Sequence, residues 1–413
     1  MKKILFLSFL FMLIFSLMAV YGQDKSFSQP VELVESIPLE TILDSPSIRN
    51  APEVWLDMIN EAEKTLDIEV FYICNEKGQP LENIINAIKE AAGRGVTVRI
   101  ISDSTFYKTY PETLDELGKV AGISVRLIPL TELTDGVMHA KYFITDGKDV
   151  FLGSQNFDWK ALNQIHEIGI RIRDEKFGQT VEKIFNLDWI ICVAKDKNEY
   201  LSELEKTADV LNSRNTLSLQ YKDETITLYP AFSPVGLIYK DMSWDEDAIT
   251  GLINNAKEEV CIQVMDYSPV GRDKSFYPVL DNAMRSAAVR GVKIKMIVAN
   301  WSNKKPAIDF IKSLSLVPNI EIKISNIPEW SGGFIEFARV EHCKYMIVDS
   351  DSTWIGTSNW EKNYFYNCRN LSVAVKSKTM NAELKEIFNK DWDGPYTEKV
   401  DPVKEYKVPK VKN

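Results

Sequence analysis

The sequence predicts a mixed α/β protein built from two homologous halves, with layered sheets and helices and one site at their interface. Three observations predict this architecture. Short apolar, β-rich runs alternate with segments of helical spacing, the whole series occurs twice, and matched residues lie 203 positions apart. Solenoid repeats are roughly 20–50 residues long, so this repeat indicates a duplicated domain with a pseudo-two-fold axis.

The elements of the first half follow from hydrophobic spacing. Residues 60–65 are expected to end a helix, and residues 66–73 form a short apolar strand. Residues 81–94 have helical spacing, and Gly95 suits the end of that helix. Asp146 and Gly147 are turn residues between two short strands. The remaining expected elements are strands at 96–101, 141–145, 150–152 and 168–172 and a closing helix at 177–189.

The second half repeats this series. Residues 253–268 resemble residues 59–74, and residues 281–296 resemble residues 85–100. Further along, the constant offset of 203 residues maps His139, Asn156, Phe185 and Trp189 onto His342, Asn359, Phe388 and Trp392. We therefore expect one domain at residues 23–220 and a second at residues 221–413.

Two of the three histidines begin matched octets. His139 opens H-A-K-Y-F-I-T-D and His342 opens H-C-K-Y-M-I-V-D, so both fit H-x-K-x-x-x-x-D. The octets also contain Lys141 with Asp146 and Lys344 with Asp349, and each is followed by a Gly, a hydroxyl residue and an Asn. Histidine can serve as nucleophile or proton carrier near neutral pH. The pairing predicts a single site that contains both histidines.

Such a site suits the cleavage of a phosphodiester. This reaction needs donors or cations for the non-bridging oxygens, a nucleophile, and an acid for the departing oxygen. One histidine would attack phosphorus, and the other would protonate the leaving oxygen and later activate water. Lysines in the place of a divalent cation favour a reaction without metal or other cofactor. The candidate phosphate donors are Lys141, Lys344, Asn156, Asn359, Ser154, Thr357 and Ser358.

The doubled H-x-K-x-x-x-x-D with its following G-S-x-N resembles the phospholipase D superfamily. The similarity covers residues 31–400 and is closer to one branch, the lysosomal type 3 and type 4 phospholipase-D-like proteins of animals. That resemblance implies that one histidine becomes phosphorylated, that the other is the acid and base, and that Lys and Asn bind phosphate without a metal. The branch implies a 5′ exonuclease on single-stranded DNA and RNA, and lipid transphosphatidylation is also attributed to it.

The halves differ at one position beside the site. Glu167 follows His139 by 28 residues, and its equivalent in the second half is Asn370. The resemblance implies that a carboxylate at this place contacts the first histidine, where it would fix the tautomer and stabilise the imidazolium. This favours His139 as nucleophile and His342 as acid and base. His166 is expected to be a strand-edge residue without a role.

Other candidates are supporting residues. Asp146 and Asp349 follow strands, where Asp commonly shapes turns, so we expect them to hold the site from behind. Phe334 and Phe337 follow two glycines and are the candidates for stacking of unpaired bases. Cys343 is expected to be a small core residue rather than a nucleophile. The five cysteines show no metal-binding spacing and predict no disulfide.

The net charge and the N-terminal residues limit which partners and which cellular compartment the protein can have. The net charge of −10 argues against a broad basic face for duplex DNA. Lys2 and Lys3 precede an apolar run at residues 4–20, which predicts a signal peptide at residues 1–22 and export to a periplasmic, secreted or lumenal location. The alternative is a retained membrane anchor, and the oligomeric state is left open.

Three functions remain open at this point. The first is an exported nuclease for single-stranded nucleic acid. The second is a phospholipase D-type phospholipid hydrolase or transphosphatidylase. The third is an inert binding protein that kept the fold, although the presence of both His, both Lys and both Asn residues argues against it.

Overall fold

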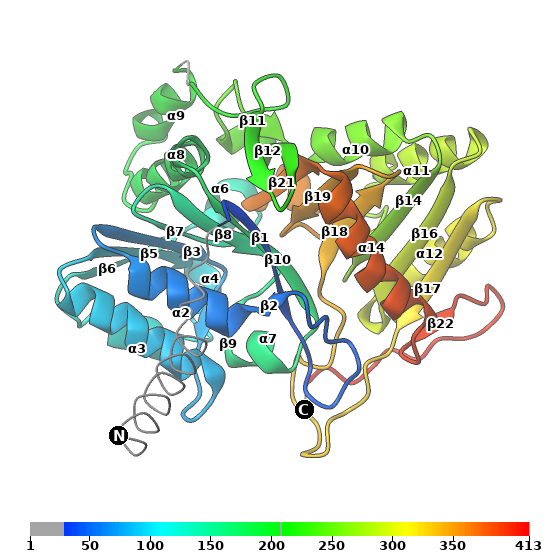
Figure 1. Cartoon of the computed structure of the whole chain (residues 1–413), viewed down its shortest axis with the longest axis horizontal. Coiled ribbons are helices and arrows are strands. Elements are labelled where there is room, and N and C mark those ends of the chain that lie inside the picture. The colour runs from blue at the N-terminus through cyan, green and yellow to red at the C-terminus, as the bar shows by residue number, and fades with distance from the viewer. Residues whose placement is uncertain (1–28, 207–208, 413) are drawn as a thin grey trace, which may run out of the picture.

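The computed structural model describes residues 29–206 and 209–412. The expected signal peptide, residues 1–22, lies outside the described residues. Within them, the strands form two large sheets that lie side by side and slant toward each other, one mostly blue to green and the other green to orange (Figure 1). Two short parallel pairs complete the strand inventory of this part of the chain: β4 (Ile73–Cys74) with β9 (Phe157–Asp158), and β15 (Tyr267–Ser268) with β20 (Trp360–Glu361).

The first sheet combines parallel and antiparallel neighbours. β3, β5 and β6 are parallel to one another, whereas β7, β8 and β10 run antiparallel to their neighbours. In spatial order its strands are β2 (Arg49–Asn50), β1 (Val31–Ser36), β10 (Glu167–Arg173), β8 (Asp149–Gly153), β7 (Lys141–Thr145), β3 (Thr65–Val70), β5 (Thr97–Asp103) and β6 (Ile123–Ile128).

The second sheet repeats this order with an extra strand at each edge. Its spatial order is β11 (Leu217–Tyr221), β12 (Glu224–Ser233), β21 (Asn370–Lys376), β19 (Ser352–Gly356), β18 (Lys344–Val348), β14 (Glu259–Val264), β16 (Lys293–Ala299), β17 (Ile320–Ser325) and β22 (Thr397–Lys399), and β13 (Ser243–Trp244) pairs with β12. Because β11 already belongs to this sheet, we propose that the C-terminal half begins near Leu217 rather than at residue 221.

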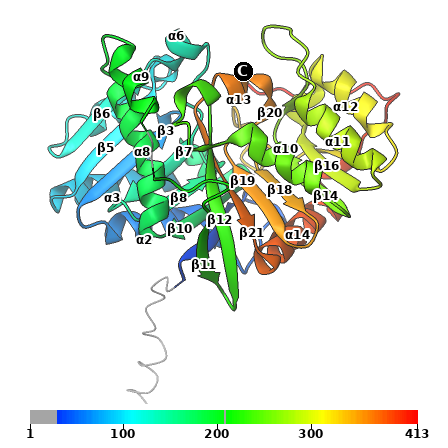
Figure 2. The ribbon, with the colours of Figure 1, turned by 90° about the horizontal axis from the view of Figure 1, so that it is seen from above.

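Helices cover both sheets (Figures 1 and 2), and the two sheets also contact each other directly at their inner faces. In the first half they are α2 (Ala51–Glu61), α3 (Pro80–Gly93), α4 (Ser104–Tyr107), α5 (Glu112–Leu117), α6 (Leu130–Thr134), α7 (Trp159–Asn163), α8 (Glu175–Ile191) and α9 (Asn198–Leu204). In the second half they are η1 (Val235–Leu237), α10 (Asp245–Asn255), α11 (Val279–Val289), η2 (Asn300–Asn303), α12 (Ala307–Ser315), α13 (Lys362–Tyr366) and α14 (Lys378–Asp393).

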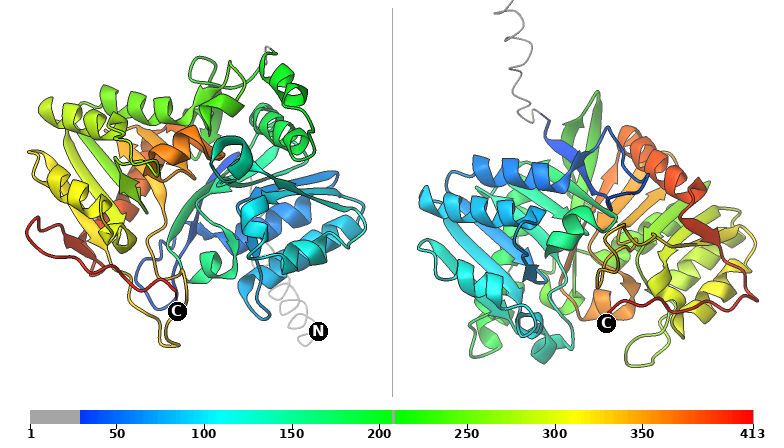
Figure 3. Two further views of the ribbon diagram at one scale, coloured as in Figure 1. Left: turned by 180° about the vertical axis from the view of Figure 1, so that it is seen from behind. Right: turned by 90° about the horizontal axis from the view of Figure 1, so that it is seen from below.

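Three large apolar cores produce the layers. One core lies between the first sheet and α2 and α3, and its counterpart lies between the second sheet and α10, α11 and α12. The central core joins inward residues of both sheets with α8 and α14, including Phe185 and Phe388. Burial of this shared surface is the main force that holds the halves together. The view from behind and the view from below show the same layers (Figure 3), so the predicted layered α/β fold is confirmed.

Most predicted elements are present with small shifts at their ends. The strand expected at residues 141–145 is β7, and the helix expected at residues 81–94 is α3. The closing helix expected at 177–189 is longer, because Asp174 caps α8 by accepting a hydrogen bond from the Phe177 N–H. Helix α2 begins at Ala51, well before residue 60. Asn50 is its N-cap residue, and Pro52 lies in its first turn, where proline is favoured.

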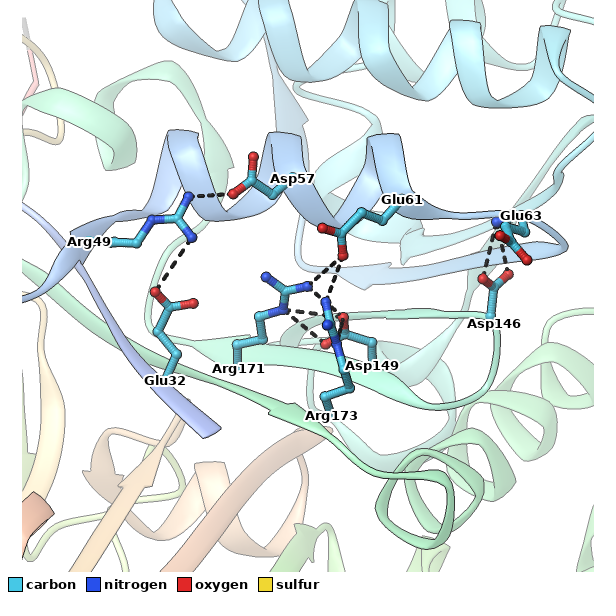
Figure 4. Close-up of polar contacts among 9 residues, drawn as sticks. All are labelled: Glu32, Arg49, Asp57, Glu61, Glu63, Asp146, Asp149, Arg171 and Arg173. Carbon is cyan, nitrogen blue, oxygen red and sulfur yellow. Dashed lines mark hydrogen bonds and ion pairs between the residues drawn. The ribbon is translucent and has the colours of Figure 1, made fainter. Parts of the chain in front are cut away.

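Charged residues fasten α2 to the first sheet (Figure 4). Arg171 is fully buried on β10 and contacts Asp149 of β8 at 2.7 Å and Glu61 of α2 at 3.1 Å. Arg173 joins the same two carboxylates. Asp146, at a left-handed φ of 53°, accepts hydrogen bonds from the backbone N–H groups of residues 63–65. These contacts fix the far end of β7, the strand whose near end follows His139.

Candidate active site

Both histidines lie just before a central strand of their own sheet. His139 precedes β7 by two residues, and His342 precedes β18 by two residues. Each pre-strand segment pairs with the opposite half rather than its own. The His139 N–H donates to the Arg369 carbonyl at 2.9 Å, and the His342 N–H donates to the His166 carbonyl at 2.9 Å. These two crossed bridges bring the octets to the interface between the halves.

Close backbone approach accompanies the first bridge. A methyl group at Gly136 would lie 2.0 Å from the carbonyl oxygen of Asn367, so this position requires glycine. The Thr134 hydroxyl also donates to that carbonyl at 2.7 Å. The contact fixes the entry of the first octet against the start of β21.

The crossing assigns each histidine a partner from the opposite half. His139 Nδ1 lies 3.0 Å from Asn370 Oδ1. The Asn370 amide nitrogen donates to the carbonyls of Tyr364 and Cys368 and to the Ser233 hydroxyl, so its oxygen must face the imidazole. An oxygen only accepts, and therefore His139 carries its proton on Nδ1 and presents the Nε2 lone pair on the opposite edge of the ring.

Glu167 contacts His342 and not His139, so the expectation that it supports the first histidine was wrong. Its Oε2 lies 2.9 Å from His342 Nδ1. The physical reason is the bridge between His342 and His166, because it places the next residue, Glu167, beside the histidine of the other half. Sequence comparison of the two halves identified Asn370 as the counterpart of Glu167 but gave no sign that both reach across.

Burial sets the protonation of the two pairs. Burial raises the pKa of Glu167 well above its ordinary value. Burial and the charges of Lys344 and Lys141 lower the pKa of His342. A proton therefore lies between Glu167 Oε2 and His342 Nδ1. Burial and the same two lysines lower the pKa of His139, which favours its neutral, nucleophilic form.

Both predicted lysines lie fully buried behind the histidines. Lys344 Nζ donates to the His342 carbonyl at 2.7 Å, and Lys141 Nζ donates to the His139 carbonyl. Burial and the positive charge of Lys344 lower the pKa of Lys141, and burial lowers the pKa of Lys344 to about 8. Neither lysine lines the cavity described below, but the charges of both act on His139 and His342, which favours the binding of an anion at the histidines.

One cavity of about 380 Å³ is lined by residues of both halves. His139, His342, Asn156 and Asn359 all line it, as the octets predicted. The Oδ1 atoms of both asparagines are buried and accept no hydrogen bond within the described part of the chain. The two halves therefore contribute two imidazoles and two amides to one site.

The three predicted hydroxyl donors do not line this cavity. Ser154 is fully buried and donates to the Ile168 carbonyl. Thr357 donates to Asn370 Oδ1 at 2.9 Å and so fixes the partner of His139. Ser358 donates to Asp245 at 2.5 Å, away from the site. Their expected role as phosphate donors was therefore wrong, because neighbouring backbone and side-chain acceptors already occupy them.

The two octet aspartates act as expected, but at the far ends of their strands. Asp349 accepts hydrogen bonds from the backbone N–H groups of residues 257–259, as Asp146 does from residues 63–65. Both adopt left-handed φ angles. They fix the β7–β8 and β18–β19 turns and contact neither histidine.

Of the two predicted stacking residues, only Phe337 lines the cavity. Phe334 lies in a separate hollow, where the Lys410 ammonium is 4.6 Å from its ring centroid. The sequence prediction missed most of the aromatic wall, because its residues other than Tyr364 lie far from the octets along the chain. That wall consists of Phe71, Tyr72, Phe106, Tyr110, Trp301 and Tyr364.

A family comparison decides the identity of this site. The family described as cardiolipin synthase, PLD-like domain, matches the chain twice, at residues 55–189 and 249–392. Each match contains one octet and together they cover more than half of the chain. The chain belongs to the phospholipase D superfamily. Its members are hydrolytic phosphodiesterases, and the protein is an enzyme of this class.

Relatives within the phospholipase D superfamily agree with the predicted branch. A phospholipase D Z of Dictyostelium discoideum is 30% identical, covering 96% of this chain and 98% of that protein. The 5'-3' exonuclease PLD4 of Mus musculus is 28% identical, covering 92% of this chain and 81% of that protein. The 5'-3' exonuclease PLD3 of Xenopus laevis is 30% identical over 88% of this chain and 80% of its own length.

The fold agrees as well. A phosphatidylserine synthase of Haemophilus influenzae has a TM-score of 0.59 at 12% identity, covering 84% of this chain and 85% of its own. That identity supports the shared fold alone. Across residues 29–206 and 209–412, every helix is too short or too polar to traverse a bilayer.

His166 was expected to lie at the edge of a strand, and the structure of this phospholipase D superfamily member places it differently. It is fully buried rather than exposed at a strand edge. Its Nδ1 lies 2.8 Å from Glu341 Oε2 and 3.7 Å from Asp391 Oδ2. Burial alone would lower the pKa of His166, but the carboxylates of Glu341 and Asp391 outweigh it and raise the pKa to about 10. Cys343, buried as expected, completes the only described cluster with metal-ligand geometry; we interpret that cluster as an ion pair.

The charge of His166 predicts a pH-dependent stability. Its unfolded pKa is about 6.5, so its contribution is complete below that pH and declines as pH rises through about 10. We expect the gap in unfolding free energy between wild type and His166→Gln to narrow between pH 6.5 and 10.5. Urea unfolding followed by tryptophan fluorescence measures this gap. Parallel curves for the two proteins would show that His166 is neutral in the folded state.

Proposed function

We propose that the protein is an exported phosphodiesterase that works through a covalent phosphohistidine and trims single-stranded DNA or RNA from the 5′ end. The observation that carries the chemistry is the pair of histidines at one cavity, each with a different partner at Nδ1. His139 offers a lone pair held by Asn370, and His342 offers a proton held by Glu167. A nucleophile and an acid are what phosphodiester cleavage requires.

In the first step, His139 Nε2 attacks phosphorus and the bond to the leaving oxygen breaks. His342 gives its Nε2 proton to that oxygen, and the proton shared with Glu167 settles on Nδ1. The products are a phosphohistidine at His139 and a neutral His342 with an Nε2 lone pair. Lys141, Lys344, Asn156 and Asn359 would stabilise the non-bridging oxygens.

In the second step, water replaces His139 on phosphorus. His342 Nε2 takes a proton from the attacking water, and the His139–phosphorus bond breaks. Nε2 of His342 is again protonated and that of His139 is again a lone pair, so the cycle closes. Burial lowers the pKa of both imidazoles, which favours their uncharged forms. The two rings are chemically the same, so their different roles follow from their different hydrogen-bond partners.

The aromatic wall favours nucleic acid as the substrate. Tyr72 stacks on Tyr110 at 4.9 Å between ring centroids, and Phe106 lies beside them. Trp301 and Phe337 supply rings from the other half. Unpaired bases stack on such rings whatever their sequence, at roughly 1–3 kcal/mol per base. The exonuclease names of several relatives point the same way and suggest the 5′ polarity.

A phospholipid hydrolase or transphosphatidylase is the second candidate. The observation in its favour is the Dictyostelium relative, which matches 96% of this chain and carries a phospholipase name. An apolar, aromatic cavity also accepts acyl chains. Both candidates share the phosphohistidine chemistry and differ in what occupies the cavity beyond phosphorus.

One experiment separates the two substrates. The purified protein is incubated in chelator with a labelled single-stranded oligonucleotide and, separately, with phosphatidylcholine vesicles. We expect stepwise shortening of the linear oligonucleotide, no release of choline, and no cleavage of a circular single strand, which has no end. His139→Asn is the matched control and should be inert. Release of choline without shortening of the oligonucleotide would contradict the proposed nuclease activity and support the phospholipid hydrolase.

Export is part of the proposal and rests on residues 1–22. Mass spectrometry of the protein recovered outside the cytoplasm should find a chain that begins near Gln23. Recovery of the full-length chain in the membrane fraction would support the anchored alternative.

A further inference from the structure

A second cavity of about 500 Å³ lies next to the candidate active site. The residues that line it are Asp135, Gly271, Arg272, Asp273, Lys362, Asn363, Tyr366 and Asn367. Arg272 lines this cavity and the histidine cavity as well. The two hollows therefore meet at its side chain.

The loop that carries Arg272 is held in place by its neighbours. It connects β15 to α11, and it turns through hydrogen bonds from the Gly271 N–H to Ser275 and from the Tyr277 N–H to Pro269. Lys362 of α13 donates to Asp273 and to the Ser275 hydroxyl, both at 2.8 Å. Figure 2 places α13 and β20 next to each other between the two halves. The loop is thus anchored to the element that follows the second octet.

Arg272 itself is left without a partner in that arrangement. Asp273 is occupied by Lys362, and no hydrogen bond or ion pair joins Arg272 to any residue that the structure describes. Its side chain is exposed. An exposed guanidinium between two cavities can bind a phosphate through two parallel hydrogen bonds.

The charges around Arg272 are mixed. Asp135 lines the second cavity, and the Glu361 carboxyl lies close enough to Arg272 for the two charges to interact. Burial and the nearby Asp266 raise the pKa of Glu361 to about 7, so this carboxyl competes weakly for Arg272 below neutral pH. The Arg272 charge also reaches His139, whose pKa is lowered mainly by burial and the two lysines and additionally by Arg272.

We propose that Arg272 binds the phosphate next to the scissile one and that the second cavity receives the continuing chain of an oligonucleotide. The inference rests on the proposed function and deepens it. A substrate with a single phosphodiester could use only the histidine cavity, whereas a polymer would use both. Arg272 would then be a specificity-determining residue for multi-phosphate substrates.

The test compares two substrates on the full chain and on Arg272→Gln. One is an eight-residue oligothymidylate, and the other is a thymidine p-nitrophenyl phosphodiester with one phosphate. We expect the KM for the octamer to rise roughly tenfold, as for the loss of a charge-assisted hydrogen bond, and the KM for the single diester to change less than about twofold. The salt dependence of the octamer KM should weaken by about one phosphate contact.

Lys274→Asn is the matched control, because it removes a positive charge from the same exposed loop at a left-handed φ that Asn tolerates. Equal KM changes in both variants, or equal changes for both substrates in Arg272→Gln, would overturn the inference while leaving the proposed function intact. A wild-type protein that cleaves the single diester but not the octamer would overturn both. Thermal unfolding of each variant confirms that the fold is kept.

Discussion

Replacing His139 by Asn is expected to abolish cleavage of every phosphodiester, by at least about 10⁴-fold in kcat, whereas His342→Asn should spare one half-reaction. His139 supplies the bond-forming lone pair, and His342, the other imidazole among the described residues that line the cavity, is assigned the proton. His342 supplies a proton, which a good leaving group does not need. The two variants should therefore differ in kind as well as in rate.

A p-nitrophenyl diester of thymidine measures this difference. With His342→Asn we expect a rapid release of about one equivalent of nitrophenolate, followed by slow turnover, because the phosphohistidine forms but water is not activated. With an ordinary oligonucleotide the same variant should lose about 10²–10⁴-fold in rate. A burst in His139→Asn and none in His342→Asn would exchange the two roles.

Arg369→Met is expected to give the largest loss of stability. Arg369 is fully buried at the interface, and its guanidinium donates to Asp188 of α8 at 2.6 and 2.7 Å and to the carbonyls of Ser233 and Leu237. Its removal leaves the buried Asp188 carboxylate without its cation. Breaking a buried pair in this way costs about 3–5 kcal/mol of unfolding free energy.

Urea unfolding measures that loss, and the double variant Arg369→Met with Asp188→Asn is its control. We expect the double variant to recover part of the stability, because no unpaired charge remains buried. Activity should fall more than stability predicts, since the Arg369 carbonyl holds the His139 backbone and Asn370 follows directly. Equal stability of Arg369→Met and wild type would show that the pair contributes nothing net.

The sequence was sufficient to predict the residues whose positions repeat. Because the octets recur in matched order, His139, Lys141 and Asn156 and their counterparts could be placed at one site without coordinates. Strand β7 could be placed to the residue, since turn residues follow it. Hydrophobic periodicity and sequence duplication can be recognised in the sequence itself. Predictions that rest on them do not require knowledge of how the two halves dock.

What could not be predicted depends on docking and on loop conformation. Glu167 was assigned to the wrong histidine because the bridges between halves form from segments with no pattern of their own. Phe337 and Phe334 are three residues apart, yet only Phe337, at a left-handed φ of 55°, reaches the cavity. His166 looked peripheral, since Glu341 and Asp391 surround it only after folding. Arg369 of the second half and Asp188 of the first half, 203 positions from His166 and Asp391 respectively, form the equivalent contact.

The exchange of partners between the halves has a consequence for how such an enzyme can change over generations. A substitution at position 370 changes the hydrogen-bond partner of His139, and a substitution at position 167 changes the partner of His342. A substitution at these positions in one half therefore affects the histidine of the other half. The two halves must consequently change together during evolution, although they are far apart along the gene. Attempts to redirect this catalyst in the laboratory should accordingly vary both copies in the same library.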